Sequence, residues 1–436
     1  MRPWRKRPRS RPDTLCLLPW LNLSVDVDGA SRPCCKFDHV SEVGRQPLSG
    51  LADAGLAGAW NSPGMQALRR QFLAGERPRA CASCWAEEDA GVPSFRQVFL
   101  RDRRVSPKVD VENLTPAQPH SLDLKLSNSC NLSCRICGPV ASSKWLAEEL
   151  AAVPVPRPPG SFVARLADDR RYLAANKLTD DPAERALLER WAPAIEHLEL
   201  TGGEPMLSKE SGDVLELLVH HGDPSRTTLQ ITTNATLMDD RIVRHLKRFR
   251  AVTISLSVDD MGPRLEYQRH PARWDEVRAN IDRYAELVSR SCQVFLNATV
   301  SAYNVWDLAD YLQWWRNSGA DRQPLRLRGI GFHPNLLHNP RSMSVQHLPE
   351  PVKVLLRQRW AAHPAWRDAR TRRVLGQVLG FMTSAEADPA CWEEFLLTTA
   401  EIDQRRHQSF EATFSDFVAH LRALDLWPSH AESGQA

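Results

Sequence analysis

The chain has 436 residues, of which 42% are hydrophobic and 25% are charged, as in an ordinary globular protein. These values exclude a largely disordered chain, a fibrous repeat and a small disulfide-stabilised scaffold. The 56 basic and 53 acidic residues leave a formal net charge of +3, so the overall charge favours neither nucleic acid nor membrane as a partner.

The beginning of the chain and its cysteines indicate where the protein works. Residues 1–12 carry six basic side chains with no apolar run behind them, and no segment approaches the ~20 apolar residues of a membrane span. We therefore expect neither a secretory signal nor a membrane anchor, and a cytoplasmic location. In a reducing compartment, the 10 cysteines are expected to bind metal or to take part in catalysis rather than to form disulfides.

Residues 13–104 are predicted to form a small domain with short strands. The alternating pattern of Leu21–Val27 predicts a strand, Asp28-Gly29 predicts a hairpin turn, and residues 64–74 predict a helix. Because this segment is too small to bury a large core, we expect bound metal to hold it together. Residues 105–119 are polar and rich in proline, which is typical of a linker.

Strands and helices are predicted to alternate over residues 118–340. The candidate strands are residues 121–126, 195–201, 228–234, 251–258, 294–301 and 324–332. Six strand–helix units predict an α/β fold with a parallel sheet, a partial (β/α)6 barrel of the TIM type whose chemistry lies at the carboxyl ends of the strands. Residues 140–191 are predicted to be a helical insertion, and residues 341–436 a helical carboxyl-terminal region.

Three cysteines, Cys130, Cys134 and Cys137, follow the first of these strands within eight residues. Thiolates are the ligands that iron–sulfur clusters prefer, and three protein ligands would leave one iron open. A structural zinc site is closed by four ligands, so the alternative is a zinc loop completed by a distant cysteine or histidine.

The cysteine motif CNLSCRIC resembles the CxxxCxxC motif of the radical S-adenosylmethionine (SAM) enzymes. Three further motifs follow at the ends of later strands in that family's order: TGGEP (201–205), TTN (232–234, with Ala235 in place of the usual glycine) and SVDD (257–260). The resemblance covers about residues 122–334. It implies a [4Fe–4S] cluster whose open iron chelates SAM, cleavage of SAM by one electron to a 5′-deoxyadenosyl radical, and abstraction of hydrogen from a substrate.

The same resemblance implies which residues contact SAM. They are Gly202, Gly203, Glu204, Thr233, Asn234, Ser257 and Arg269. The two glycines would allow the backbone to approach the methionine end closely, and Glu204 would accept a hydrogen bond from its ammonium group. Ser257 and Arg269 resemble the pair that holds its carboxylate, since a guanidinium suits a bidentate carboxylate.

Two of these residues have an equally good local interpretation. Thr233 and Asn234 would contact the ribose or the methionine, or they would cap the helix that follows. No residue is identified as a catalytic acid or base.

The amino-terminal cysteines resemble the auxiliary-cluster domain called SPASM or twitch, in the subgroup that places it before the barrel. Cys16, Cys34, Cys81 and Cys84 would close a second [4Fe–4S] cluster, with Cys35 as a rival to Cys34. The C-x₂-C spacing by itself equally allows a zinc knuckle.

Several other residues are predicted to be structural. Cys292 and Cys391 are expected to be small buried hydrophobic residues, and Trp314 and Trp315 to belong to a core or an interface. His333 would lie near the barrel mouth, where a structural role is the main expectation and a site role the alternative.

The resulting hypothesis is a radical SAM enzyme with two clusters that acts on a peptide or on a small sugar-like metabolite. Its reductant would be an electron donor such as flavodoxin or ferredoxin, and neither nucleic acid nor membrane is expected as a partner. The alternatives are a zinc-binding interaction protein and an iron–sulfur electron-transfer protein that does not cleave SAM.

Overall fold

Eight strands form one sheet in the order β2-β1-β3-β4-β5-β6-β7-β8. The computed structural model describes residues 12–27, 29–37, 51–89, 94–101, 109–152, 178–317 and 330–428. The strands are β1 (Asn22–Val25), β2 (Ser31–Arg32), β3 (Ser121–Lys125), β4 (His197–Thr201), β5 (Thr228–Thr233), β6 (Ala251–Leu256), β7 (Cys292–Val300) and β8 (Gly331–Leu336).

Helices follow most of the strands and make up most of the carboxyl-terminal part. They are α1 (Leu18–Leu21), α3 (Leu51–Trp60), α4 (Pro63–Leu73), α5 (Ala82–Asp89), α6 (Phe95–Arg101), α7 (Ser143–Ala152), α10 (Pro182–Trp191), α11 (Lys209–His221), α12 (Asp240–Val243), α13 (Gly262–Gln268), α14 (Trp274–Ala285), α15 (Leu308–Asn317), α16 (Glu350–Ala362), α17 (Ala369–Met382), α18 (Pro389–Arg406), α19 (Phe410–Thr413) and α20 (Ser415–Ala423). Within the described ranges, none of these helices combines the length and the apolar character that crossing a bilayer requires.

The chain divides into two compact units, which are described separately. The first unit comprises Met1–Ser129, Val153–Gln230 and Arg241–Ala251. The second unit comprises Cys130–Ala152, Ile231–Asp240 and Val252–Ala436.

In the first unit, the amino-terminal hairpin joins the edge of the larger sheet. β1 and β2 are antiparallel, as the hairpin prediction requires, and Gly29 between them has a φ of 79°. β1 also pairs in parallel with β3, from Asn22 beside Ser121 to Val25 beside Leu124. The sequence analysis did not predict this second pairing, which adds two strands to the six expected.

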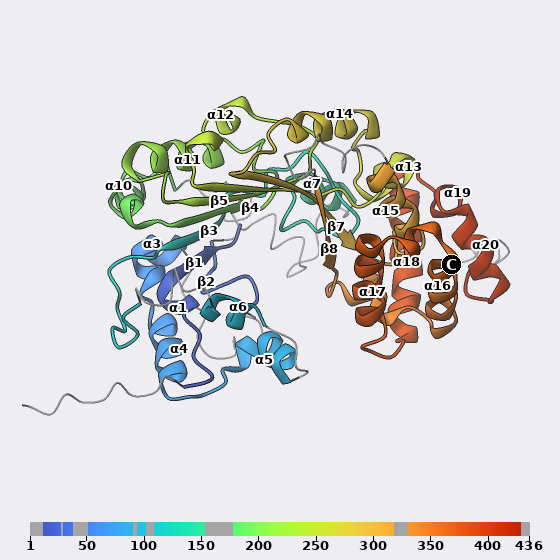
Figure 1. Cartoon of the computed structure of the whole chain (residues 1–436), viewed down its shortest axis with the longest axis horizontal. Helices are drawn as coiled ribbons and strands as arrows, with labels where there is room; N and C mark the ends of the chain where they lie inside the picture. Colours follow the sequence, from blue (N-terminus) through green and yellow to red (C-terminus); the bar gives the residue numbers. More distant parts are fainter. Residues whose placement is uncertain are drawn as a thin grey trace, which may run out of the picture. The chain divides into compact units, whose positions relative to one another are not determined.

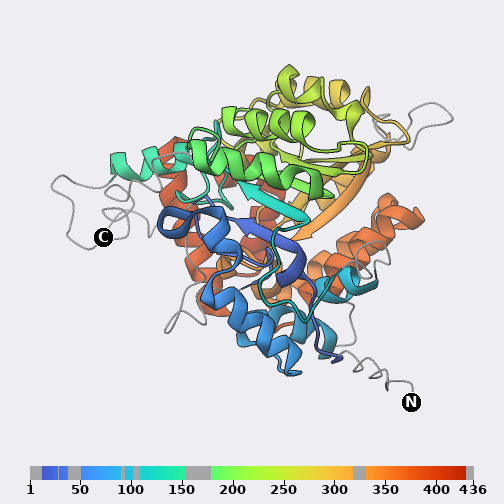
Figure 2. The ribbon, with the colours of Figure 1, turned by 90° about the vertical axis from the view of Figure 1, so that its left-hand side faces the viewer.

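Helices cover both faces of this part of the sheet (Figure 1). α10 and α11 lie on one side of β3 and β4, and α1 and α4 lie on the other (Figure 2). α4 begins after Ser62, whose side chain accepts a hydrogen bond from the backbone of Met65, and this confirms the helix predicted at residues 64–74. Its buried face packs into a core that also contains Trp20 and Cys16.

In the second unit, β7 pairs in parallel with β6 and with β8. The last strand was predicted at residues 324–332, but residues 318–329 lie outside the described part of the chain and the described strand is Gly331–Leu336. β8 is the last strand in the sheet order and therefore an edge strand. It tolerates Pro334, which has no N–H to donate, because one side of an edge strand forms no hydrogen bonds with a neighbouring strand.

The predicted insertion and the carboxyl-terminal region are helical where they are described. α7 and α10 lie within residues 140–191, of which residues 153–177 are not described. Helices α16 to α20 confirm the helical carboxyl-terminal part, in which Trp360 and Phe395 are fully buried.

Candidate functional site

The three clustered cysteines lie on a loop that starts at the carboxyl end of β3. Cys134 is buried, and the backbone N–H of Cys137 donates to the carbonyl of Cys134 at 2.9 Å. Burial raises the pKa of Cys134 to about 12 and that of Cys137 to about 11. Both thiols are therefore protonated at neutral pH unless a bound cation stabilises the thiolates.

Backbone hydrogen bonds hold this loop against the segment that follows α13. The N–H of Ser133 donates to the carbonyl of His270 at 2.7 Å, and the N–H of Arg135 donates to that of Gln268 at 2.8 Å. The indole N–H of Trp145, on α7, donates to the carbonyl of Cys134 at 2.7 Å. Because the cysteine backbone is fixed in this way, little conformational entropy remains to be lost when a ligand binds.

Arg135, inside the cysteine motif, anchors the loop to α18. The side chain is 1% exposed, and its guanidinium lies 3.6 Å from the centre of the Tyr267 ring. It donates to the carbonyl of Tyr267 at 3.1 Å, to Gln408 at 2.9 Å and to the carboxylate of Asp403.

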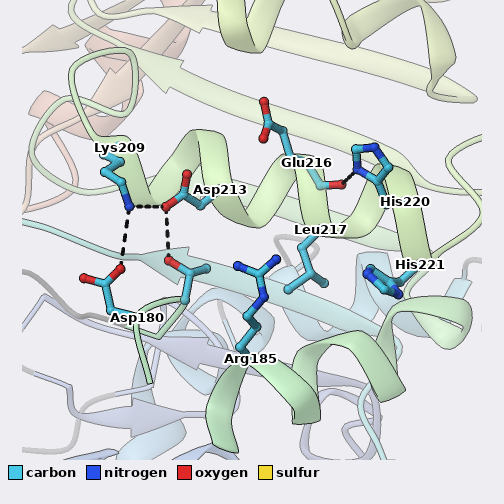
Figure 3. Close-up of a pocket in the computed structure, with 9 residues that line it drawn as sticks. Asp180, Arg185, Lys209, Asp213, Glu216, Leu217, His220 and His221 are labelled. Atoms are coloured by element: carbon cyan, nitrogen blue, oxygen red, sulfur yellow. Dashed lines mark hydrogen bonds and ion pairs between the residues drawn. The ribbon is translucent and has the colours of Figure 1, made fainter. Parts of the chain in front are cut away.

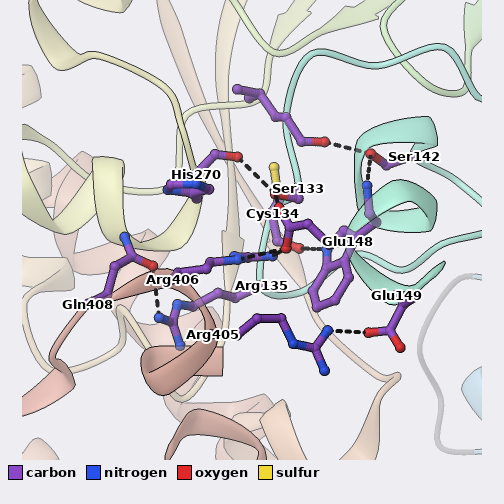
Figure 4. Close-up of polar contacts among 12 residues, drawn as sticks. Ser133, Cys134, Arg135, Ser142, Glu148, Glu149, His270, Arg405, Arg406 and Gln408 are labelled. Atoms are coloured by element: carbon purple, nitrogen blue, oxygen red, sulfur yellow. Dashed lines mark hydrogen bonds and ion pairs between the residues drawn. The ribbon is translucent and has the colours of Figure 1, made fainter. Parts of the chain in front are cut away.

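A second anchor connects the loop to α7 and to the end of α18 (Figure 4). The hydroxyl of Ser133 donates to Glu148, and Arg406 donates to the same carboxylate at 3.0 and 2.8 Å. Arg406 also lies 4.7 Å from the centre of the Trp145 ring. The sequence analysis missed both anchors, because ion pairs between distant segments leave no local pattern.

Arg269, predicted to contact SAM, lies beside the middle cysteine. Its Nη1 is 3.8 Å from Sγ of Cys134, and its Nε donates to Oδ2 of Asp259 at 2.7 Å. Burial alone would lower the pKa of Arg269, but the carboxylate of Asp259 outweighs it and raises the pKa. The other oxygen of Asp259 accepts the backbone N–H of Thr299 at 2.8 Å, so this carboxylate fixes the position of Arg269.

Ser257, the predicted companion of Arg269, follows β6 in the same unit. Its backbone N–H donates to the carbonyl of Thr233 at 2.7 Å. Asp259 belonged to the predicted SVDD motif, but its contact with Arg269 was not predicted.

The glycine pair of the TGGEP motif lies against the chain that leads into the cysteine loop. Gly202 and Gly203 have φ values of 79° and 48°, the region that favours glycine. A Cβ on Gly203 would lie 2.4 Å from the carbonyl oxygen of Ser129, and one on Gly202 would lie 2.6 Å from Cβ of Lys125. The glycines are thus required by contact with the protein itself, in addition to the approach to SAM that was predicted.

Glu204 is completely buried in the same turn. Its N–H donates to the carbonyl of Ser129 at 2.8 Å, and its Oε1 accepts the N–H of Met206 at 2.9 Å. A buried carboxylate on a fixed backbone is suited to accept from an ammonium group.

Asn234 links the third motif to the cysteine loop. Its amide donates to Oδ1 of Asn131 at 2.9 Å, while its own Oδ1 accepts from the backbone and hydroxyl of Thr236 at 2.9 and 2.6 Å. These contacts form a turn well before α12 begins at Asp240, so Asn234 does not cap that helix. Ala235 adopts a φ of 61° at the position where the related motif has glycine.

Three of the four amino-terminal cysteines, Cys16, Cys34 and Cys81, belong to or pack against one core cluster. Cys16 and Cys84 are buried, and Cys34 and Cys81 pack against the same core cluster. Burial raises the pKa of Cys16, and the neighbouring thiols of Cys81 and Cys84 raise it further.

The two adjacent cysteines at 34 and 35 have different neighbours. After burial, the main influences that raise the pKa of Cys34 are Cys16 and Cys35, whereas those that raise the pKa of Cys35 are Asp123 and Glu199. Cys34 therefore lies near Cys16, and Cys35 lies near Asp123 and Glu199.

A pocket of about 450 Å³ lies beside these cysteines within the first unit. Its lining combines thiol, aromatic and polar side chains: Leu18, Leu21, Asn22, Cys34, Cys35, Phe95, Phe99, His120, Ser121, Asp123, Glu196, His197, Glu199, Thr228, Gln230 and Arg250.

A second hollow, between α10 and α11, is lined by charged residues that neutralise one another (Figure 3). Lys209 donates to Asp213 at 2.7 Å and lies 3.6 Å from Asp180. The Nδ1 atom of His220 lies 2.7 Å from the carbonyl of Glu216. Among the described residues, the Lys209–Asp213 and Lys209–Asp180 pairs thus compensate each other's charge on an exposed surface.

One group in the described part of the chain has its possible metal-binding atoms within 4.8 Å of one another: His347, Asp388 and Cys391. Arg341 donates from Nε to Nε2 of His347 at 3.3 Å and pairs with Asp388 at 3.2 Å. A guanidinium therefore already contacts two members of this group.

The structure shows the burial and the neighbours of the residues that were predicted to be structural. Cys292 is buried at the start of β7, and Trp315 is buried and donates to the carbonyl of Ile330 at 3.0 Å. His333 is exposed, and its Nδ1 lies 3.3 Å from Oδ1 of Asn297.

Comparison with known proteins assigns this arrangement to a class. Residues 124–314 match the Radical SAM superfamily, and residues 16–85 match SPASM, an iron–sulfur cluster-binding domain. Residues 124–314 therefore form a radical SAM domain, and residues 16–85, which precede it in the chain, form an auxiliary iron–sulfur domain. These two domains indicate [4Fe–4S] clusters and SAM as the cofactors.

Particular relatives cover only part of the chain. Proteins named GTP 3′,8-cyclase 3 from Mycobacterium bovis and Mycobacterium tuberculosis are each 26% identical over 214 residues, which is 48% of this chain and 49% of theirs. The chain thus spans about half the length of these curated relatives.

Solved structures show more distant likeness. Native anSMEcpe with bound AdoMet has a TM-score of 0.31 at 15% identity, over 49% of this chain and 51% of that one. SuiB of Streptococcus suis bound to the precursor peptide SuiA has a TM-score of 0.30 at 16% identity, over 59% and 62%.

Proposed function

We propose that this protein cleaves SAM reductively at a [4Fe–4S] cluster held by Cys130, Cys134 and Cys137, and that it abstracts hydrogen from a substrate. The observation that carries the proposal is the cysteine loop itself, because its backbone is fixed and Arg269 lies 3.8 Å from Sγ of Cys134. When bound, the cluster and SAM supply a single electron and a 5′-deoxyadenosyl radical.

The residues of the chain bind and orient the cofactor in this proposal. Glu204 accepts from the ammonium group of SAM, while Arg269 and Ser257 hold its carboxylate. Gly202 and Gly203 let the backbone approach the methionine end of SAM, and Thr233 and Asn234 contact its ribose or its methionine. Asp259 keeps Arg269 in place through its 2.7 Å hydrogen bond.

The amino-terminal cysteines hold a second [4Fe–4S] cluster in this proposal. Its ligands are Cys16, Cys34, Cys81 and Cys84, and the choice of Cys34 is supported by its position among the other thiols. We assign residues 13–104 to this domain, residues 118–340 to the barrel with its insertion at 140–191, and residues 341–436 to the helical region.

The substrate is a peptide or a small sugar-like metabolite, and the electron comes from a donor such as flavodoxin or ferredoxin. Of these two substrate classes, the small metabolite is supported by the 26% identity to proteins named GTP 3′,8-cyclase.

The decisive experiment measures SAM cleavage. Protein reconstituted with iron and sulfide under anaerobic conditions is incubated with dithionite and SAM, and 5′-deoxyadenosine is quantified. We expect about eight irons per chain, from two clusters of four, and release of 5′-deoxyadenosine. Cys134→Ala is expected to abolish the release, whereas Cys391→Ala, a buried cysteine of α18 outside both sets, is expected to retain it.

Two other outcomes would contradict the proposal. Colourless protein that contains zinc instead of iron would identify an interaction protein with zinc knuckles. Iron-loaded protein that binds SAM without releasing 5′-deoxyadenosine would identify an electron carrier.

A further inference from the structure

The pocket of about 450 Å³ in the first unit contains two carboxylates on neighbouring strands. Asp123 of β3 and Glu199 of β4 are direct partners in the parallel register, and both line the pocket. Asp123 is only 7% exposed. Two acidic side chains side by side under such burial are unfavourable unless something compensates them.

Each carboxylate is only half satisfied by the protein. Ser24 donates to Oδ2 of Asp123 at 2.7 Å, and Gln230 donates to Oε1 of Glu199 at 2.8 Å. Within the described ranges, no hydrogen-bond donor reaches the second oxygen of either carboxylate. One oxygen of each residue is therefore left as an acceptor at the pocket.

Among the described residues, the cations near the pocket form no ion pair with these two acids. Lys125, two residues along β3, pairs with Asp26, and Arg32 pairs with the same Asp26. Arg250 lines the pocket together with His197, whose pKa burial and the charge of this arginine lower to about 4. His197 is thus neutral at physiological pH and contributes no positive charge.

The remaining groups around the pocket do not neutralise it either. Glu196 also lines the pocket, but it lies 3.4 Å from Nη2 of Arg226, which is not among the lining residues. The thiol of Cys35 lies near Asp123 and Glu199. Burial and the proximity of Asp123 raise the pKa of Glu199 to about 7. This direction is the expected response of a buried carboxylate beside a second one, which the charge of Lys125 offsets only in part.

We propose that this pocket binds a protonated amine or guanidinium group of the substrate, with Asp123 and Glu199 as its acceptors. The inference rests on the proposed function, since it names the substrate class of that enzyme. A cation with several N–H donors would satisfy both free oxygens and compensate both charges. A triphosphate would be repelled by the same two carboxylates.

The test measures binding of agmatine, which carries a guanidinium, to the full reconstituted chain by anaerobic calorimetry without reductant or SAM. N-butylurea serves as an uncharged probe of similar shape. We expect agmatine to bind at least about tenfold more tightly than N-butylurea, and Asp123→Asn and Glu199→Gln each to weaken agmatine binding about tenfold. Glu112→Gln, which removes an exposed carboxylate outside the pocket, is expected to leave the affinity unchanged.

Three results would overturn the inference. They are equal affinity for the two probes, unchanged agmatine affinity in both pocket variants, and tighter binding of GTP than of agmatine. Iron content and thermal unfolding of each variant show whether it is folded. A variant that keeps the wild-type melting temperature but no longer binds agmatine supports the site.

The outcome is separable from the proposed function. Release of 5′-deoxyadenosine from SAM is assayed on the same preparations without agmatine. If wild-type protein binds agmatine but releases no 5′-deoxyadenosine, the proposed function fails while the binding site stands. If it releases 5′-deoxyadenosine but does not discriminate between the probes, only the substrate class is wrong.

Discussion

Asp259 illustrates how one side chain prepares another for its ligand. It accepts from Arg269 at 2.7 Å and from the backbone of Thr299 at 2.8 Å, so the guanidinium is already fixed beside Cys134. Residues that orient the groups around a metal centre contribute strongly to its activity even though they do not touch the metal.

Asp259→Asn is expected to lower the rate of SAM cleavage about 10- to 100-fold, because Arg269 loses its charged partner. The measurement is 5′-deoxyadenosine formation at saturating dithionite, together with the electron paramagnetic resonance spectrum of the reduced cluster on addition of SAM. Asp260→Asn is the matched control, since this neighbouring buried carboxylate pairs with Arg264 instead. Equal rates for the two variants would show that Asp259 does not position Arg269.

His197 predicts a dependence of stability on pH. Burial and the charge of Arg250 lower its pKa from 6.5 to about 4 in the folded protein. Between these two values the unfolded chain binds a proton that the folded chain does not, so stability decreases as the pH falls through this window.

His197→Gln is therefore expected to be less sensitive to acid than the wild type, by about 2 kcal/mol in the free energy of unfolding at pH 5 relative to pH 7. Urea unfolding at the two pH values measures this difference. His220→Gln, at an exposed histidine of α11, is expected to follow the wild type. A parallel loss of stability in all three proteins would assign the acid sensitivity to other groups.

At the scale of elements, α18 holds the cysteine loop from a distance of more than 250 residues in the chain. The carboxylate of Asp403 accepts three hydrogen bonds. The donors are the guanidinium of Arg135 in the loop, the hydroxyl of Tyr267 at 2.7 Å and the backbone N–H of Phe410 at 2.6 Å. The carboxyl-terminal helices thus contribute to the cluster site as well as forming a core of their own.

Asp403→Asn is expected to loosen the loop and to release the iron of one cluster, about half of the total, on exposure to a chelator. Glu401→Gln alters a carboxylate on the same helix that pairs with Arg405, and it is expected to retain all the iron. Iron analysis after gel filtration tests both variants; full retention by the Asp403 variant would restrict α18 to a structural role.

The elements that the sequence predicted well are those with local patterns. Alternating apolar residues located β3 to β7 within a few residues. The contacts of Gly202, Glu204 and Asn234 with SAM stay a prediction. The last predicted strand, 324–332, lies mostly outside the described residues, and its end overlaps β8 at residues 331–332.

The elements that the sequence could not predict depend on pairing between distant segments. Nothing in Asn22–Val25 indicates β3 as its partner, since the pairing depends on register over about 100 intervening residues. The anchors at Arg135 and the position of Cys34 among the other thiols arise in the same way.

At the scale of the whole molecule, the protein combines two sets of thiols in different parts of the chain. The first set includes Cys34 and lies in the first unit, whereas Cys134 and its neighbours on the loop belong to the second unit. Loss of one cluster is therefore expected to leave the other in place.

Cys34→Ala is expected to halve the iron content, from about eight to about four, and to leave release of 5′-deoxyadenosine detectable. Cys35→Ala is expected to retain the full iron content, because its thiol faces Asp123 and Glu199 rather than the other cysteines. The reverse result, with iron lost only from the Cys35 variant, would exchange the two assignments.

The pairing of β1 with β3 has a consequence for biosynthesis. The ribosome releases residues 22–25 long before it has made residues 121–125, so the edge that these segments share stays open while the chain between them emerges. Slow translation or a shortage of chaperones would prolong that interval and favour inclusion bodies, whereas a circularly permuted gene that encodes the two segments close together would shorten it.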